Sequence, residues 1–156
     1  MLGDGNCLFR ALSRLLFGSE DWHSFVRQLL MEFESLNSSL FQAYCDGDIM
    51  DHISRIKYLT TWGTHTELQA AASLIQVPIY VCTQKCGSRQ YYWELFKPIR
   101  NYSFRFPESQ FNKPVGIHHF EICHTMRCHY DLITMSDGLR PIEPPKIVSA
   151  PLCQPS

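Results

Sequence analysis

The spacing of apolar residues changes near residue 76, and this change limits the folds open to the chain. Before it, apolar residues recur every three or four positions, as in Leu8–Phe17 and Trp22–Phe33, which predicts amphipathic helices. After it, short runs such as Val77–Cys82 are apolar and partly β-branched, which is typical of buried strands. A helical half followed by strands predicts an α+β fold with a small, mainly antiparallel sheet packed between helices.

Capping and turn residues set the expected ends of these elements. Helices are predicted over Leu8–Phe17, from a Ser19 cap through Phe33, over Leu36–Tyr44 and Ile49–Leu59, and from a Thr64 or Thr66 cap through Ile75. Strands are predicted over Val77–Cys82, Gln90–Phe96, His118–Cys123 and His129–Met135, with a loop over Arg100–Val115. Trp22 and Phe25 belong to the apolar face of the second helix, so we expect both in the core.

Length and C-terminal composition predict the domain organisation. The 156 residues suit one domain, which we place over residues 1–137 as the catalytic domain. Residues 138–156 hold five of the nine prolines and are expected to form an extended, proline-rich tail. A motif typical of a catalytic site begins at residue 4, so we expect the natural protein to continue upstream of Met1.

Composition argues against several classes of function. The formal net charge is −1 and the basic residues form no stripe, so we expect no nucleic-acid partner. No apolar run has the length of a transmembrane helix, and the first residues do not read as a signal peptide. Seven cysteines, an odd number without a secretion signal, indicate reduced thiols and a cytoplasmic or nuclear location. We expect a monomer that needs neither a cofactor nor a metal.

Cys7 is the candidate nucleophile, because it stands between a glycine-containing turn and the start of a predicted helix. The N–H groups and dipole at a helix N-terminus stabilise an anion, so the pKa of this thiol is expected to be lowered. The same N–H groups, with those of the turn that holds Gly5 and Asn6, could bind the oxyanion of a tetrahedral intermediate. Asp4 is expected to hold this turn together by accepting backbone N–H bonds.

His129 is the candidate general base. Residues two apart on a strand share a face, so His129 and Asp131 should project together and the carboxylate can orient the imidazole. Cys7, His129 and Asp131 would then supply the nucleophile, base and acid of a Cys-His-Asp triad. Tyr130 should face the other way, toward the core.

Three segments, in this order along the chain, resemble the hallmark blocks of the ovarian-tumour (OTU) cysteine proteases. They are Asp4-Gly5-Asn6-Cys7-Leu8-Phe9-Arg10, Trp62-Gly63-Thr64-His65-Thr66-Glu67-Leu68-Gln69-Ala70-Ala71 and His129-Tyr130-Asp131. The resemblance implies the papain-like OTU fold, with Cys7 as nucleophile and His129 as general base and acid. It implies Asp131 as the third triad member, but Asp4 matches an aspartate assigned as catalytic in other members, so the choice of acid stays open.

The resemblance also implies a deubiquitinase activity. The reaction would be hydrolysis of the isopeptide bond between the C-terminus of ubiquitin and a lysine, through a thioester on Cys7. Ubiquitin, a polyubiquitin chain or a ubiquitin-like modifier would be the partner. Because the ubiquitin tail ends in two glycines, the site needs a narrow channel, and we expect Trp62, Trp93 and Tyr130 to line it.

Two other interpretations stay open. The chain could be a catalytically weak module that binds ubiquitin. It could also be a structural zinc domain, since cysteine and histidine are zinc ligands, although the spacings do not match the common paired Cys-x-x-Cys pattern. The residues that offer such ligands are Cys82, Cys86, Cys123, His124, Cys128 and His129.

Overall fold

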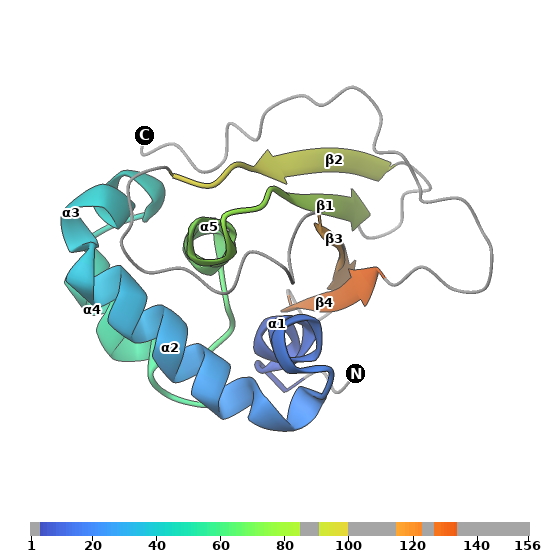
Figure 1. Ribbon diagram of the computed structural model, residues 1–156, viewed down its shortest axis with the longest axis horizontal. Helices are drawn as coiled ribbons and strands as arrows, with labels where there is room; N and C mark the ends of the chain where they lie inside the picture. Colours follow the sequence, from blue (N-terminus) through green and yellow to red (C-terminus); the bar gives the residue numbers. More distant parts are fainter. Residues whose placement is uncertain (1–3, 85–90, 100–114, 123–126, 134–156) are drawn as a thin grey trace.

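The computed structural model describes residues 4–84, 91–99, 115–122 and 127–133. Helices come first along the chain and strands follow (Figure 1). The α-helices are α1 (Cys7–Phe17), α2 (His23–Leu36), α3 (Ser38–Phe41), α4 (Ile49–Ile56) and α5 (His65–Ile75), and the 3₁₀ helices are η1 (Glu20–Trp22) and η2 (Gln42–Tyr44). None of the helices in these ranges is long and apolar enough to cross a bilayer. The order of the elements confirms the prediction that helices form the first half of the chain.

Four strands form one mixed sheet in the order β2-β1-β3-β4. They are β1 (Ile79–Gln84), β2 (Tyr91–Phe96), β3 (Val115–Ile122) and β4 (Arg127–Ile133). β1 pairs with β2 and β3 with β4 in antiparallel fashion, whereas β1 and β3 run parallel. The prediction of an α+β fold with a mainly antiparallel sheet is confirmed.

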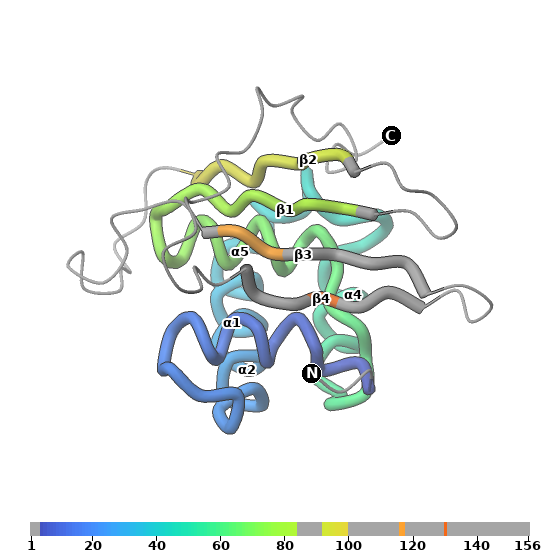
Figure 2. The backbone as a smooth tube through the Cα atoms, turned by 90° about the vertical axis from the view of Figure 1, so that its right-hand side faces the viewer, coloured from blue at the N-terminus to red at the C-terminus, as the bar shows by residue number. Residues whose placement is uncertain are grey.

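The helices enclose the core together with the sheet. Figure 2 shows the strands side by side, with α5 against one face and α1 beside β4. The core residues from α1, α2, α5 and β1 include Leu8, Leu30, Leu68 and Ile79, each at most 1% exposed. A helix whose apolar residues all point one way gains stability mainly by such packing. The sheet edge formed by β4 is thereby brought against the N-terminal helix.

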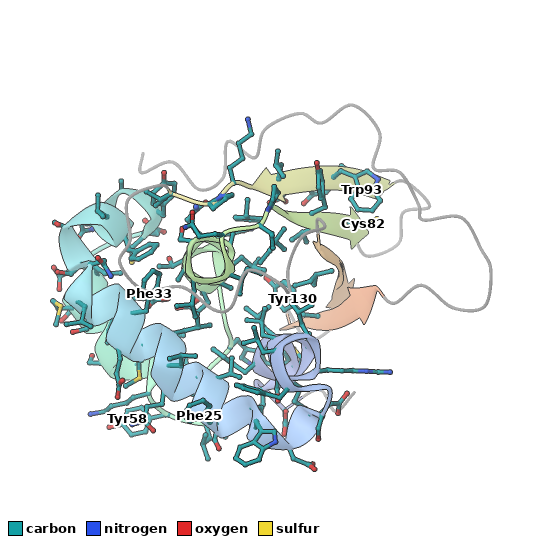
Figure 3. All side chains as sticks on the ribbon, viewed as in Figure 1. Phe25, Phe33, Tyr58, Cys82, Trp93 and Tyr130 are labelled. Atoms are coloured by element: carbon teal, nitrogen blue, oxygen red, sulfur yellow. The ribbon has the colours of Figure 1, made fainter. Side chains whose placement is uncertain are left out.

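Two aromatic residues that we expected in the core lie at the surface instead. Trp22 is 56% exposed and Phe25 49% exposed, and Phe25 is on the outer side of α2 (Figure 3). The prediction fails because η1 interrupts the helical register: the Trp22 N–H donates to Ser13 Oγ at 3.1 Å, and α2 begins only at His23. Phe17 contacts both rings, so the aromatic residues pack on each other outside the core.

Several predicted boundaries shift. β1 begins at Ile79 rather than Val77, β3 begins at Val115 within the predicted loop, and Thr64 rather than Thr66 caps α5. The chain over the predicted helix 36–44 divides into the end of α2, α3 and η2. The predicted proline-rich tail, 138–156, lies outside the described residues, so its boundary stays a prediction.

Candidate active site

The site is built where the start of α1 meets β4. Cys7 is the first residue of α1 and is 1% exposed. The backbone N–H of Tyr130 donates to Cys7 Sγ at 3.4 Å, although the two residues are 123 positions apart. Tyr130 stands between His129 and Asp131 on β4. The fold therefore brings the candidate nucleophile to the strand segment that carries the candidate base.

Tyr130 fixes which way its neighbours on β4 face. Its side chain is 3% exposed and belongs to the core, as predicted, and Figure 3 shows it between the sheet and the helices. Successive residues of a strand point to opposite faces, so the expectation that His129 and Asp131 project together, away from Tyr130, stays a prediction. The backbones of His129 and Asp131 are in β4, while their side chains lie outside the described part of the structure.

The thiol of Cys7 is not an activated thiolate in this environment. Burial raises the pKa of Cys7 above its usual value, because a buried thiolate loses its solvation. The N–H groups of Tyr130, Leu8 and Cys7 itself act in the opposite direction and offset only part of this effect, and the charge of Asp4 adds to the increase. The expected lowering of the pKa by the helix start is therefore wrong.

Asp4 organises the loop before Cys7, as predicted. Its Oδ1 accepts the Asn6 N–H at 3.1 Å and its Oδ2 accepts the Asn6 Nδ2 amide at 3.3 Å. Arg10 donates to both oxygens of the same carboxylate, from Nη1 to Oδ1 at 2.5 Å and from Nη2 to Oδ2 at 2.8 Å. These bonds, foremost the one from Arg10, hold the pKa of Asp4 far below its usual range. Both carboxylate oxygens are thus committed to the loop.

Asn6 occupies the N-cap position of α1 without capping it. Its side chain makes no bond to the first turn, because Oδ1 accepts from Arg27 and Nδ2 donates to Asp4. The helical ladder begins with the bond from Arg10 N–H to Asn6 C=O at 2.8 Å. A helix leaves its first N–H groups without intrahelical partners. Those of Cys7 and Leu8 lie against the Cys7 thiol, whose pKa they lower, and donors at this place can stabilise an oxyanion.

Gly5 allows the loop to approach the α4–α5 connection closely. Its φ is +89°, in the region that favours glycine, and a Cβ placed there would lie 2.2 Å from the backbone oxygen of Thr60. No larger residue fits at this contact without moving one of the two backbones. The close approach sets the position of the loop relative to residues 57–64.

Arg27 is a site residue that the sequence interpretation did not identify. It is 2% exposed on α2, and burial lowers its pKa to about 10. Its guanidinium donates to Asn6 Oδ1 at 2.8 Å and to the Gly5 carbonyl at 3.2 Å. It also donates to the carbonyls of Ile56, Leu59 and Thr61 at 2.7 to 3.2 Å. One buried cation therefore holds the loop before Cys7 to the segment between α4 and α5.

Trp62 and Trp93 are the other residues that we expected to line the substrate channel. Trp62 packs half-buried against the core, and Trp93 is half-buried on β2, paired in register with Cys82 (Figure 3). Glu67 is fully buried, and its Oε2 accepts from the Thr64 N–H and hydroxyl at 2.6 and 2.7 Å, closing a capping box. Glu67 therefore has a structural role at the start of α5, while the substrate channel stays a prediction.

Comparisons with known proteins agree with this arrangement. A family model described as OTU-like cysteine protease matches residues 2–130. The chain is 38% identical over 81 residues to OVARIAN TUMOR DOMAIN-containing deubiquitinating enzyme 9 of Arabidopsis thaliana, a match that covers 52% of this chain and 24% of that relative. The chain thus spans about a quarter of that curated relative.

Solved structures show the same fold at low identity. The OTU domain of OTUD1 superposes with a TM-score of 0.62 at 22% identity, covering 85% of this chain and 81% of that one. The Hazara virus OTU bound to ubiquitin superposes with a TM-score of 0.55 at 15% identity, covering 86% of this chain and 80% of that one. Because the family model matches residues 2–130 of the 156, the chain belongs to the OTU-like cysteine protease family.

Proposed function

We propose that this chain is a deubiquitinase that hydrolyses the isopeptide bond between the C-terminus of ubiquitin and a lysine. The observation that carries the proposal is the bond from Tyr130 N–H to Cys7 Sγ, which sets the nucleophile against the strand of His129 and Asp131. The relative in Arabidopsis thaliana is named a deubiquitinating enzyme, and the Hazara virus OTU was solved bound to ubiquitin. Both support ubiquitin as the partner.

The raised pKa of the Cys7 thiol favours general-base catalysis over a preformed ion pair. His129 removes the thiol proton as Sγ attacks the carbonyl carbon of the terminal glycine of ubiquitin. The S–C bond forms, the C–N bond to lysine breaks, and the proton on His129 passes to the leaving amine. Water activated by His129 then cleaves the thioester and returns the thiol.

The oxyanion of each tetrahedral intermediate is assigned to the start of α1. The Asn6 N–H is already bound to Asp4 and its side-chain amide to the same carboxylate. The donors for the oxyanion are therefore the N–H groups of the first helical turn, beginning with Cys7, where the positive end of the helix dipole adds to them. Leaving this turn without a side-chain cap costs about 1 kcal/mol of stability, which we attribute to the catalytic use of these donors.

Asp131 is the proposed third member of the triad. Asp4 accepts four hydrogen bonds from Asn6 and Arg10, and a histidine would have to displace one of them. Asp131 instead follows His129 by two positions on β4, and the alternation of side chains along a strand supports a shared face for the two. We assign the orientation of His129 to Asp131 and the shape of the oxyanion loop to Asp4.

A panel of differently linked di-ubiquitins tests the activity. The wild-type chain should release mono-ubiquitin from at least one linkage, and Cys7→Ala should release none. Binding of di-ubiquitin without cleavage by the wild-type chain would favour the alternative, a ubiquitin-binding module. Cleavage that persists in Cys7→Ala would remove Cys7 as the nucleophile.

A further inference from the structure

A cluster of three ionisable side chains lies in the core, away from Cys7. Glu34 comes from α2, His52 from α4 and Glu67 from α5. Glu34 and Glu67 are 0% exposed and His52 is 8% exposed. Among the residues that the structure describes, these form a group whose possible ligand atoms all lie within 4.8 Å of one another. Burial of ionisable groups is costly unless something compensates their charge.

Glu34 is the member whose burial the fold does not explain. Neither of its carboxylate oxygens has a donor group within hydrogen-bond geometry, and its carboxyl group lies against that of Glu67. A carboxyl group placed beside a second carboxylate in the core needs either a proton or a cation between them.

Glu67 and His52 are already oriented toward the same point. Glu67 Oε2 is held by Thr64 at the start of α5, which leaves Oε1 facing the cluster. Glu67 Oε1 lies 2.5 Å from His52 Nε2. The capping box therefore fixes one carboxylate oxygen, and the imidazole meets it from α4.

We propose that Glu34, His52 and Glu67 form a binding site for a divalent transition-metal ion of the Zn²⁺ type. Two carboxylates and one imidazole are a donor set that such ions accept. In a tetrahedral site with metal–ligand bonds of about 2.1 Å, ligand atoms lie about 3.4 Å apart. The atoms of this cluster, all within 4.8 Å of one another, reach that arrangement by small movements of the side chains.

The site would close with one solvent ligand. His52 is the member with some exposure, its side chain being 10% exposed, so we assign the solvent ligand to its side of the cluster. A bound ion would also link α2, which carries Arg27, to α4 and α5, which residues 57–64 connect. The sequence led us to expect no metal, because it shows no conventional ligand spacing.

Cobalt, as a spectroscopic substitute for zinc, tests the proposal in the full chain. The measurement uses a Cys7→Ala background, which removes the catalytic thiol as a competing ligand. We expect stoichiometric Co²⁺ binding and a d–d absorption without a thiolate-to-cobalt charge-transfer band. Zn²⁺ should displace the Co²⁺ and raise the melting temperature. Glu34→Gln and His52→Asn should each abolish this binding.

His65→Asn is the matched control. It removes the imidazole of another histidine–carboxylate pair, in which His65 lies 3.4 Å from Glu94, and should leave the cobalt spectrum unchanged. The proposal is overturned if the parent binds no Co²⁺, or if binding persists in both cluster variants. It is also overturned if the spectrum shows thiolate ligation, which would point to the cysteines instead. If Glu34→Gln does not fold, His52→Asn and the spectrum of the parent decide between these outcomes.

Discussion

The guanidinium of Arg27 donates to the side-chain oxygen of Asn6, the residue before the nucleophile, at 2.8 Å. The same group reaches the Gly5 carbonyl, the carbonyl at the last residue of α4 and two carbonyls of the chain between α4 and α5. It also stacks on the Phe9 ring, 3.9 Å from the ring centroid. The loop that precedes Cys7 is therefore positioned from within the core, by a residue of α2 that is remote from it in sequence.

Arg27→Lys should lower kcat more than it raises KM for a ubiquitin substrate. An ammonium keeps the charge but cannot fork to five acceptors, so the loop loses its fixed position while the outer surface is unchanged. Arg27→Met should reduce the free energy of unfolding by at least about 3 kcal/mol, because several buried carbonyls lose their donor. Steady-state kinetics and urea unfolding measure the two effects. The exposed Arg14→Lys is the control and should change neither, whereas an unaltered kcat in Arg27→Lys would remove Arg27 from the positioning of the loop.

Gly5→Ala should abolish activity because the added Cβ would collide with the Thr60 carbonyl. Gly18→Ala is its matched control, since Gly18 also has a positive φ, +73°, but nothing lies within 4 Å of the added carbon. The control should lose only the backbone preference, about 1–2 kcal/mol, and keep its turnover. Activity on di-ubiquitin together with thermal melting separates the two variants. Equal behaviour of the two would mean that the Thr60 contact does not matter.

Cys7 should react slowly as a nucleophile when His129, its proposed base, is removed. Burial raises its thiol pKa, so alkylation of Cys7 in His129→Ala should follow a midpoint above about 8.5, the value of a free cysteine. The thiol is the unreactive form, so reactivity should rise with pH up to and through that midpoint. The pH dependence of iodoacetamide labelling at Cys7, read by mass spectrometry, gives this value. A midpoint below about 7 would indicate that the loop and helix start alone stabilise the thiolate.

Asp4 should contribute to stability at neutral pH and lose this contribution in acid. Its folded-state pKa lies far below its usual value, so its contribution is complete above the unfolded pKa of about 3.9 and is lost as pH falls below it. The difference in unfolding free energy between wild type and Asp4→Asn should therefore be constant from about pH 5 upward and shrink below about pH 4. Urea unfolding at a series of pH values measures it. A difference that changes between pH 6 and 8 would show that Asp4 titrates with another group, as a partner of His129 would.

Much of the fold could be predicted because its signals are local. The spacing of Leu8, Leu12 and Leu15 and the apolar run at Ile79 each reflect one element and its buried face. Thr64 and Glu67 form the capping box that their spacing allows. Trp22 was misassigned because helical periodicity does not show that η1 breaks the register just before α2.

The candidate site could be predicted only where the residues that carry its chemistry are close together in the sequence. Cys7 beside its turn, and His129 two residues before Asp131, are such cases. Arg27 and Glu34 carried a weaker signal: they are seven residues apart on α2 and share its buried side, but a charge on a helix is ordinarily solvated. Their partners on α4, α5 and the chain between those helices come from long-range packing, which periodicity cannot reveal. The pKa of Cys7 was misjudged for the same reason, because its burial depends on β4.

The most direct test of the account is to locate the adduct formed with a ubiquitin that ends in a C-terminal electrophile. Intact mass and peptide mapping should show one ubiquitin on Cys7 of the wild-type chain. Cys7→Ala should form no adduct, and His129→Ala should form it on the order of 10²–10⁴-fold more slowly. An adduct on another cysteine, or equally fast labelling of His129→Ala, would contradict the assignment of Cys7 and His129 as nucleophile and base.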